Sequence, residues 1–261
     1  MTTRTIQTRG AEIVLDDTGE AEPALIFLHY WGGSARTWSP VVARLPDGAR
    51  KVAINQRGWG GSRATDGAYD LQALGDDVMD IVETLGIGRY VLVGHSMGGK
   101  VAQILAGRRA RGLLGLVLVA PAPPTPMQVP SDVRTSMLAS YQSREGVIAA
   151  LKVLAGPTLG DAQREQVIED TLRGDPDAKR SWPESGMLVD ISGALAGLDL
   201  PVEIVLAEHD QVERETVLRP LFSNHLPGAT ITTDPVAGHL VPLEAPQAVA
   251  AACARLLARL H

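Results

Sequence analysis

A serine, an aspartate and a histidine, residue types that can act together in acyl transfer, occur at positions that could meet in one site. Ser96 lies in GHSMG, residues 94–98, between an apolar run, YVLV, and a run with helical spacing, MGGKVAQILAG. A serine on a tight strand-to-helix turn exposes its Oγ, and the flanking glycines permit close backbone packing. The helix N-terminus also favours developing negative charge. We therefore predict that Ser96 is a nucleophile.

Such a serine needs a base, and the base needs an orienting group. After turns of this kind the acid precedes the base along the chain. Asp210 ends the run VEIVLAEHD, and His239 follows the run ATITTD. Both residues lie just beyond expected strands, so their side chains can converge at the carboxyl edge of a parallel sheet. The order Ser96, Asp210, His239 predicts nucleophile, acid and base.

Other acidic and histidine side chains compete for these roles. Glu208, two residues before Asp210, is the alternative acid. Among the histidines, we expect His29 to stabilise a turn and His95 to pack beside the serine. His225 and His261 are expected to be surface or packing residues.

Acyl transfer also needs two backbone donors aimed at the oxyanion of the tetrahedral intermediate. The N–H of Met97, at the start of the expected helix, is one candidate. The loop HYWGGS, residues 29–34, follows another apolar run, and its small residues permit close approach to a ligand. We predict that the Trp31 N–H is the second donor; a glycine-rich turn with a packed Trp is the alternative.

The elements that would position these residues alternate between short apolar runs and helical patterns, which is typical of parallel strands joined by helices. Strands are expected over residues 12–15, 24–28, 51–55, 90–93, 114–119, 203–207 and 229–233, and helices over 70–85, 97–108 and 246–260. The pattern predicts an α/β fold with a mostly parallel central sheet flanked by helices.

The alternation fails between residues 121 and 198, where APAPPTPMQVP leads into several helical patterns. We predict a helical cap at 121–198 inserted into a core of 1–120 and 199–261, with Ser131 and Asp161 as helix N-caps. Four residues of this cap could line an apolar substrate pocket, together with Leu240, which follows the predicted base. The alternative is that they pack within the protein without contacting a ligand. The four are Met127, Tyr141, Trp182 and Met187.

Composition excludes several classes. The chain has 261 residues, a net charge of −6 and one cysteine, Cys253, which cannot form an internal disulfide. The acidic balance argues against nucleic acid as a partner. No signal peptide or membrane span is visible, so a soluble, cytoplasmic protein is expected. Scattered histidines without H-E-x-x-H or C-x-x-C predict no metal, and no cofactor is implied.

Five motifs in order resemble those of the α/β-hydrolase superfamily, across nearly the whole chain outside the cap: HYWGGSARTW, NQRGWGGS, GHSMGG, EHDQV and AGHLVPLEAP. The resemblance implies the triad Ser96, Asp210 and His239, with Trp31 and Met97 as backbone donors. Tyr30 replaces the family's usual Gly, and Asn55 its usual Asp. If that Gly serves an unusual φ, Tyr30 would shift the loop or add a hydroxyl to the site.

The expected function is a serine hydrolase using an acyl-enzyme, with a carboxylesterase on small or medium uncharged esters as the first hypothesis. A lactonase, carbon–carbon bond hydrolase or perhydrolase would use the same triad. A non-catalytic small-molecule receptor on the same fold is the second alternative. Oligomeric state is not predicted.

Overall fold

A nine-stranded sheet forms the centre of the computed structural model, which describes residues 1–260. Its order is β1-β2-β4-β3-β6-β7-β8-β9, and β5 pairs with β2. The strands are β1 (Thr2–Gln7), β2 (Ala11–Asp17), β3 (Ala24–Leu28), β4 (Arg50–Ile54), β5 (Arg63–Ala64), β6 (Tyr90–His95), β7 (Leu113–Val119), β8 (Val202–Ala207) and β9 (Thr230–Asp234). From β4 through β9 along this order, neighbouring strands are parallel.

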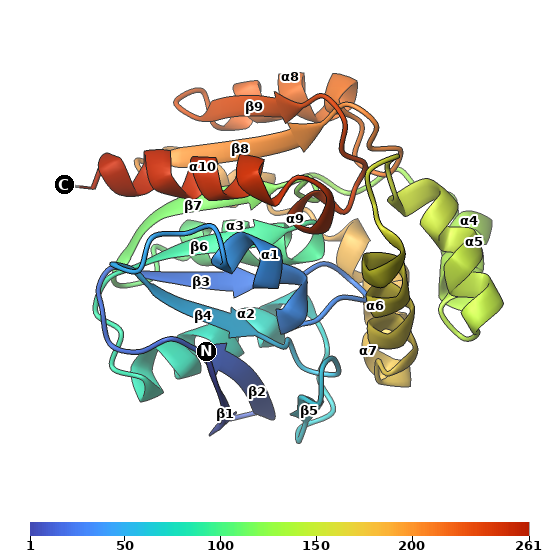
Figure 1. The fold of residues 1–261 in the computed structure, drawn as a ribbon, viewed down its shortest axis with the longest axis horizontal. Coiled ribbons are helices and arrows are strands. Elements are labelled where there is room, and N and C mark those ends of the chain that lie inside the picture. Colours follow the sequence, from blue (N-terminus) through green and yellow to red (C-terminus); the bar gives the residue numbers. More distant parts are fainter. Residues whose placement is uncertain (261) are drawn as a thin grey trace.

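Helices cover both faces of this sheet, as Figure 1 shows. Leu25 and Phe27 of β3 point into one apolar cluster with α1 (Ser39–Val42) and α10 (Pro246–Ala258). Ile26 and Leu28 point into another with α2 (Leu71–Thr84), α3 (Met97–Gly107) and α8 (Glu215–His225). Alternate residues of a strand face opposite sides, so a continuous apolar run is what a doubly covered strand requires. The predicted fold class is confirmed.

The prediction was wrong in some local details. It omitted β1, whose side chains are mostly exposed, and the two-residue β5. Ser131 and Asp161 are the first helical residues of α4 (Ser131–Ser140) and α6 (Asp161–Leu172), and Pro130 and Gly160 occupy the N-cap positions instead. Proline and glycine side chains cannot accept a capping hydrogen bond, which is why the pattern pointed to the neighbouring polar residue.

Between β7 and β8 the chain forms four helices, in what we call the inserted segment, residues 120–201. Its elements are α4 (Ser131–Ser140), α5 (Arg144–Leu154), α6 (Asp161–Leu172), α7 (Pro176–Glu184) and the short 3-10 turns η2 (Gly186–Leu188) and η3 (Ser192–Leu195). Figure 1 shows α4 to α7 beyond the carboxyl ends of the parallel strands. The remaining short elements are η1 (Ala35–Trp38) and α9 (Val241–Glu244). None of the helices within residues 1–260 has the length and apolar character that a membrane crossing requires.

Candidate active site

Ser96 occupies the turn between β6 and α3 in a backbone conformation that side chains rarely adopt. Its φ is 51° and its ψ is −115°. Such a conformation costs about 1–3 kcal/mol and persists only when the surroundings impose it. Here they do: a Cβ on Gly94 would lie 2.5 Å from the Gly98 carbonyl oxygen, so the turn closes only without one.

Gly98 is the sharper test of this packing, because a Cβ there would lie 2.3 Å from the Leu28 carbonyl oxygen. That oxygen belongs to the central strand β3 and cannot move cheaply. We expect Gly98→Ala to lower the free energy of unfolding by about 1–3 kcal/mol, measured by denaturant unfolding. Gly228→Ala is the control, since a methyl group added there would have nothing within 4 Å of it. Equal stability of the two variants would contradict the account.

Asp210 and His239 follow β8 and β9, the neighbouring strands at the edge of the sheet, and they are joined. The His239 Nδ1–H donates to Asp210 Oδ2 over 2.8 Å, and both residues are buried. The backbone N–H groups of Val212 and Glu213 donate to Asp210 Oδ1 over 2.8 and 2.9 Å. Burial alone would raise the pKa of Asp210, but His239 and these donors outweigh it and hold that pKa below its ordinary value. The carboxylate is therefore ionised at neutral pH.

The competing acid lies elsewhere. Glu208 is exposed, and its backbone N–H donates to the Asp234 carbonyl, so this residue serves the β8–β9 connection. Since Nδ1 of His239 carries the proton shared with Asp210, Nε2 is left as an acceptor.

Ser96 and His239 line one cavity of about 480 Å³. Ser96 Oγ makes no hydrogen bond within residues 1–260, so the structure places the serine and histidine at a shared site without joining them directly. Catalytic hydrogen bonds are often long in unliganded enzymes and tighten when substrate binds.

His95 is the neighbour of Ser96 that supports the histidine loop. Its Nε2–H donates to the His239 carbonyl oxygen over 2.8 Å, and the two rings are 5.1 Å apart. Burial, with His239 close by, holds the pKa of His95 well below its ordinary value, so the ring stays neutral. The sequence indicated only a packed neighbour; the hydrogen bond depends on residues 144 positions apart.

Of the two predicted backbone donors, Met97 follows Ser96 directly in the chain and Trp31 lines the same cavity as Ser96. Met97 is the first residue of α3, and Trp31 lies in the loop after β3. In the part of the chain from residue 1 to 260, neither N–H donates to another protein group. The loop is fixed at its start by His29, whose Nδ1–H donates to the Tyr30 carbonyl over 2.7 Å and whose Nε2 accepts from the Gln56 N–H over 3.0 Å. Burial lowers the pKa of His29 to about 4, which keeps this bridging tautomer neutral.

Tyr30 fits the loop without strain. Its φ is not positive; within the loop the residue with a positive φ is Gly32, at 99°. The Tyr30 ring packs against His95, with centroids 5.0 Å apart. A glycine is therefore not required at this position by backbone conformation.

Most of the predicted pocket residues line the cavity, namely Tyr30, Met127, Tyr141, Trp182 and Met187. Leu240 does not: it is fully buried in a separate apolar cluster with Tyr30 and residues of α5 and α6. The sequence did not reveal that α4, α5 and the loop after Asp210 also line the cavity. Their lining residues include Val133, Met137, Val153 and Gln211. These helices carry no motif, and only their placement brings them to the cavity.

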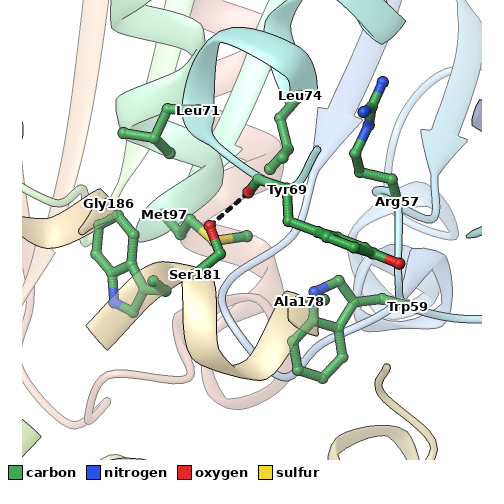
Figure 2. Close-up of a pocket in the computed structure, with 10 residues that line it drawn as sticks. Arg57, Trp59, Tyr69, Leu71, Leu74, Met97, Ala178, Ser181 and Gly186 are labelled. Carbon is green, nitrogen blue, oxygen red and sulfur yellow. Dashed lines mark hydrogen bonds between the residues drawn. The ribbon is translucent and has the colours of Figure 1, made fainter. Parts of the chain in front are cut away.

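A much smaller cavity lies between the core and α7. Figure 2 shows Met97 and Ala178 among its lining residues and the Ser181 hydroxyl donating to the Tyr69 carbonyl, over 2.6 Å. Its volume of about 10 Å³ is at the limit for one water molecule, so no substrate fits there. Among residues 1–260, no group of three or more His, Cys, Asp or Glu side chains could hold a metal ion.

Comparison with known proteins gives a consistent fold. Residues 25–252 match the model of the alpha/beta hydrolase family. A non-heme chloroperoxidase from Kitasatospora aureofaciens is 32% identical over 124 residues, which cover 47% of this chain and 44% of that protein. A bifunctional esterase/perhydrolase from Acinetobacter calcoaceticus is 27% identical over 232 residues, covering 78% of this chain and 80% of that protein.

Among solved structures, an esterase from Exiguobacterium antarcticum superposes with a TM-score of 0.88 at 17% identity. The match covers 97% of this chain and 98% of that one. At this identity the likeness establishes the fold alone.

Proposed function

This chain belongs to the α/β-hydrolase family, and on that premise we propose that it is a serine hydrolase forming an acyl-enzyme, with carboxylesterase activity on small or medium-sized uncharged esters. One observation carries the proposal. A histidine bonded to a buried, ionised carboxylate shares an apolar cavity with a serine held in a strained turn.

In the proposed reaction Ser96 Oγ attacks the ester carbonyl carbon while His239 Nε2 takes the hydroxyl proton. The N–H groups of Trp31 and Met97 stabilise the oxyanion. The intermediate collapses, the C–O bond to the alcohol breaks, and His239 gives its proton to the leaving alcohol. Water, deprotonated by His239, then attacks the acyl carbon. The second tetrahedral intermediate collapses, the bond between the acyl carbon and Ser96 Oγ breaks, and His239 returns its proton to Oγ as the acid leaves. Asp210 orients the imidazole and stabilises its protonated form.

The cavity supports an uncharged substrate. Among its lining residues within 1–260 there is no Asp, Glu, Lys or Arg, and most are apolar or aromatic. An anionic acyl chain would lose its water without gaining a cationic partner, which is costly.

The inserted segment supports the cap assignment. Helices α4, α5 and α7 supply cavity residues such as Met137, Val153 and Trp182, while Ser96 and His239 come from the core. We therefore propose that residues 121–198 act as a cap over a core of 1–120 and 199–261.

Perhydrolysis is a second candidate, favoured by the similarity to the Acinetobacter esterase/perhydrolase. Hydrogen peroxide would replace water as the attacker of the acyl-enzyme and yield a peracid. Lactonase and carbon–carbon hydrolase activities would use the same triad on other bonds.

A panel of p-nitrophenyl esters tests the substrate class. We expect kcat/KM for the neutral butyrate to exceed that for the matched monosuccinate, which ends in a carboxylate, by about 10-fold or more. Ser96→Ala provides the blank, and lactones, vinylogous diketones and peroxide complete the panel. Turnover confined to the diketones would contradict the esterase proposal, and equal rates on the two esters would contradict the charge argument.

A further inference from the structure

The oxyanion loop is held from one side by the inserted segment. In the loop at residues 30–34, the Trp31 carbonyl accepts a hydrogen bond from the Tyr141 hydroxyl over 3.3 Å, and the Gly32 carbonyl accepts one from the Thr171 hydroxyl over 3.1 Å. Within residues 1–260 these are the hydrogen bonds that the two carbonyls accept. These two carbonyls are therefore held by hydroxyl groups of the inserted segment and not by the core.

Further contacts fix the same stretch. The Trp31 ring stacks on Tyr141 at 3.8 Å between centroids, with 12° between the planes, and its Nε1–H donates to the Lys179 carbonyl over 3.2 Å. The Ser34 hydroxyl donates to Asp170 Oδ2 over 2.8 Å. Three helices, α4 at its C-cap, α6 and α7, thus contact one short loop.

Close packing makes these contacts specific. A Cβ on Gly32 would lie 2.8 Å from the Tyr141 ring and 3.1 Å from the Thr171 hydroxyl, and Gly32 has a φ of 99°. Tyr141 and Thr171 are both buried, at 3% and 0% exposure. Buried hydroxyls need hydrogen-bond partners, so each one locks the carbonyl that it faces.

The Trp31 N–H shares a peptide plane with the Tyr30 carbonyl, which accepts hydrogen bonds from the His29 Nδ1–H and the Gly33 N–H. The inserted segment holds the other side of the same residue, its ring and its carbonyl, together with the Gly32 carbonyl. Rotation about the backbone bonds of Trp31 is therefore restricted from both sides. An oxyanion donor must be oriented before the charge develops, and a displacement of about 1 Å can cost on the order of 10²-fold in rate.

We propose that Tyr141 and Thr171 are positioning residues that hold the Trp31 N–H in line with the oxyanion, so that the inserted segment completes the catalytic geometry as well as lining the pocket. This inference rests on the proposed function, in which Trp31 is an oxyanion donor.

The test uses Tyr141→Phe, Thr171→Val and the double variant, which remove the hydroxyls and keep the shapes. We expect the double variant to lose about 10- to 100-fold in kcat on the preferred p-nitrophenyl ester, with KM within about twofold. An alkyl trifluoromethyl ketone, which forms a tetrahedral adduct with the serine, should bind more weakly in parallel. The matched alkyl ether, which fills the cavity without an oxyanion, should bind unchanged.

Two further variants separate positioning from packing. Thr171→Ser restores the hydroxyl and should restore kcat. Thr135→Val is the matched control, because the Thr135 hydroxyl donates to the Ser131 carbonyl within α4 over 3.0 Å and does not contact the loop. If the double variant does not fold, the comparison of Thr171→Val with Thr171→Ser decides the matter.

Unchanged kcat in Tyr141→Phe and Thr171→Val would overturn the positioning inference, while wild-type turnover would leave the proposed function standing. Equal weakening of the ketone and the ether would overturn it too, because that result indicates a pocket role. Absence of turnover in the wild type, with no fluorophosphonate label on Ser96, would instead overturn the proposed function.

Discussion

Ser96→Ala should lower kcat on the preferred ester by about 10⁶-fold, because no covalent intermediate can form without the hydroxyl. The fold should persist, since Ser96 Oγ makes no hydrogen bond within residues 1–260 and alanine is smaller. Activity is measured on highly purified protein, and thermal melting confirms that the variant is folded.

A matched control removes a hydroxyl from the same cavity. Ser136 also lines it, and its Oγ donates to the Asp132 carbonyl within α4 over 2.9 Å. Ser136→Ala should keep near-normal kcat, and a fluorophosphonate should label the wild type and Ser136→Ala at Ser96. Retention of most activity in Ser96→Ala, or labelling at another residue, would remove Ser96 from the nucleophile role.

Asp210→Asn should lower kcat by roughly 10⁴-fold. The amide can still accept from the Val212 and Glu213 N–H groups, so the loop should hold. What changes is the partner of His239 Nδ1: an amide NH₂ facing that atom favours the tautomer with the proton on Nε2. The imidazole then cannot accept the serine proton. Single-turnover measurements of acylation report this step directly.

Glu208→Gln is the control, because it makes the same chemical change in an exposed residue two positions away. It should leave kcat unchanged. If Glu208→Gln rather than Asp210→Asn abolished acylation, the acid would have been assigned to the wrong carboxylate.

The strands could be predicted from the sequence where they are buried, because buried strands consist mainly of apolar residues. β3 and β8 are apolar throughout most of their length because both of their faces are covered, and the sequence identifies them. β1 was missed because its side chains are mostly exposed, so its pairing with β2 leaves no apolar pattern.

The site could be predicted to the extent that it depends on local turns. Ser96 is identified by its flanking glycines, whose absent side chains permit contacts that a Cβ would block. Leu240 shows the limit: it adjoins His239 in sequence, yet it packs into a different cluster because side-chain direction depends on the backbone. The role proposed for Thr171 depends on a contact with a residue 139 positions earlier, which no local pattern contains.

The hydrogen bonds of the Trp31 and Gly32 carbonyls join two stretches that are distant in the sequence, so a change in one stretch affects the other. In recombination between homologues, the inserted segment has the form of a module that could be exchanged to change specificity. Tyr141 and Thr171 would leave with that module, while the loop they hold would stay behind. A chimera therefore keeps these two hydrogen bonds only if residues 30–34 are exchanged together with the helices, or if the incoming segment supplies hydroxyl groups at the same two positions.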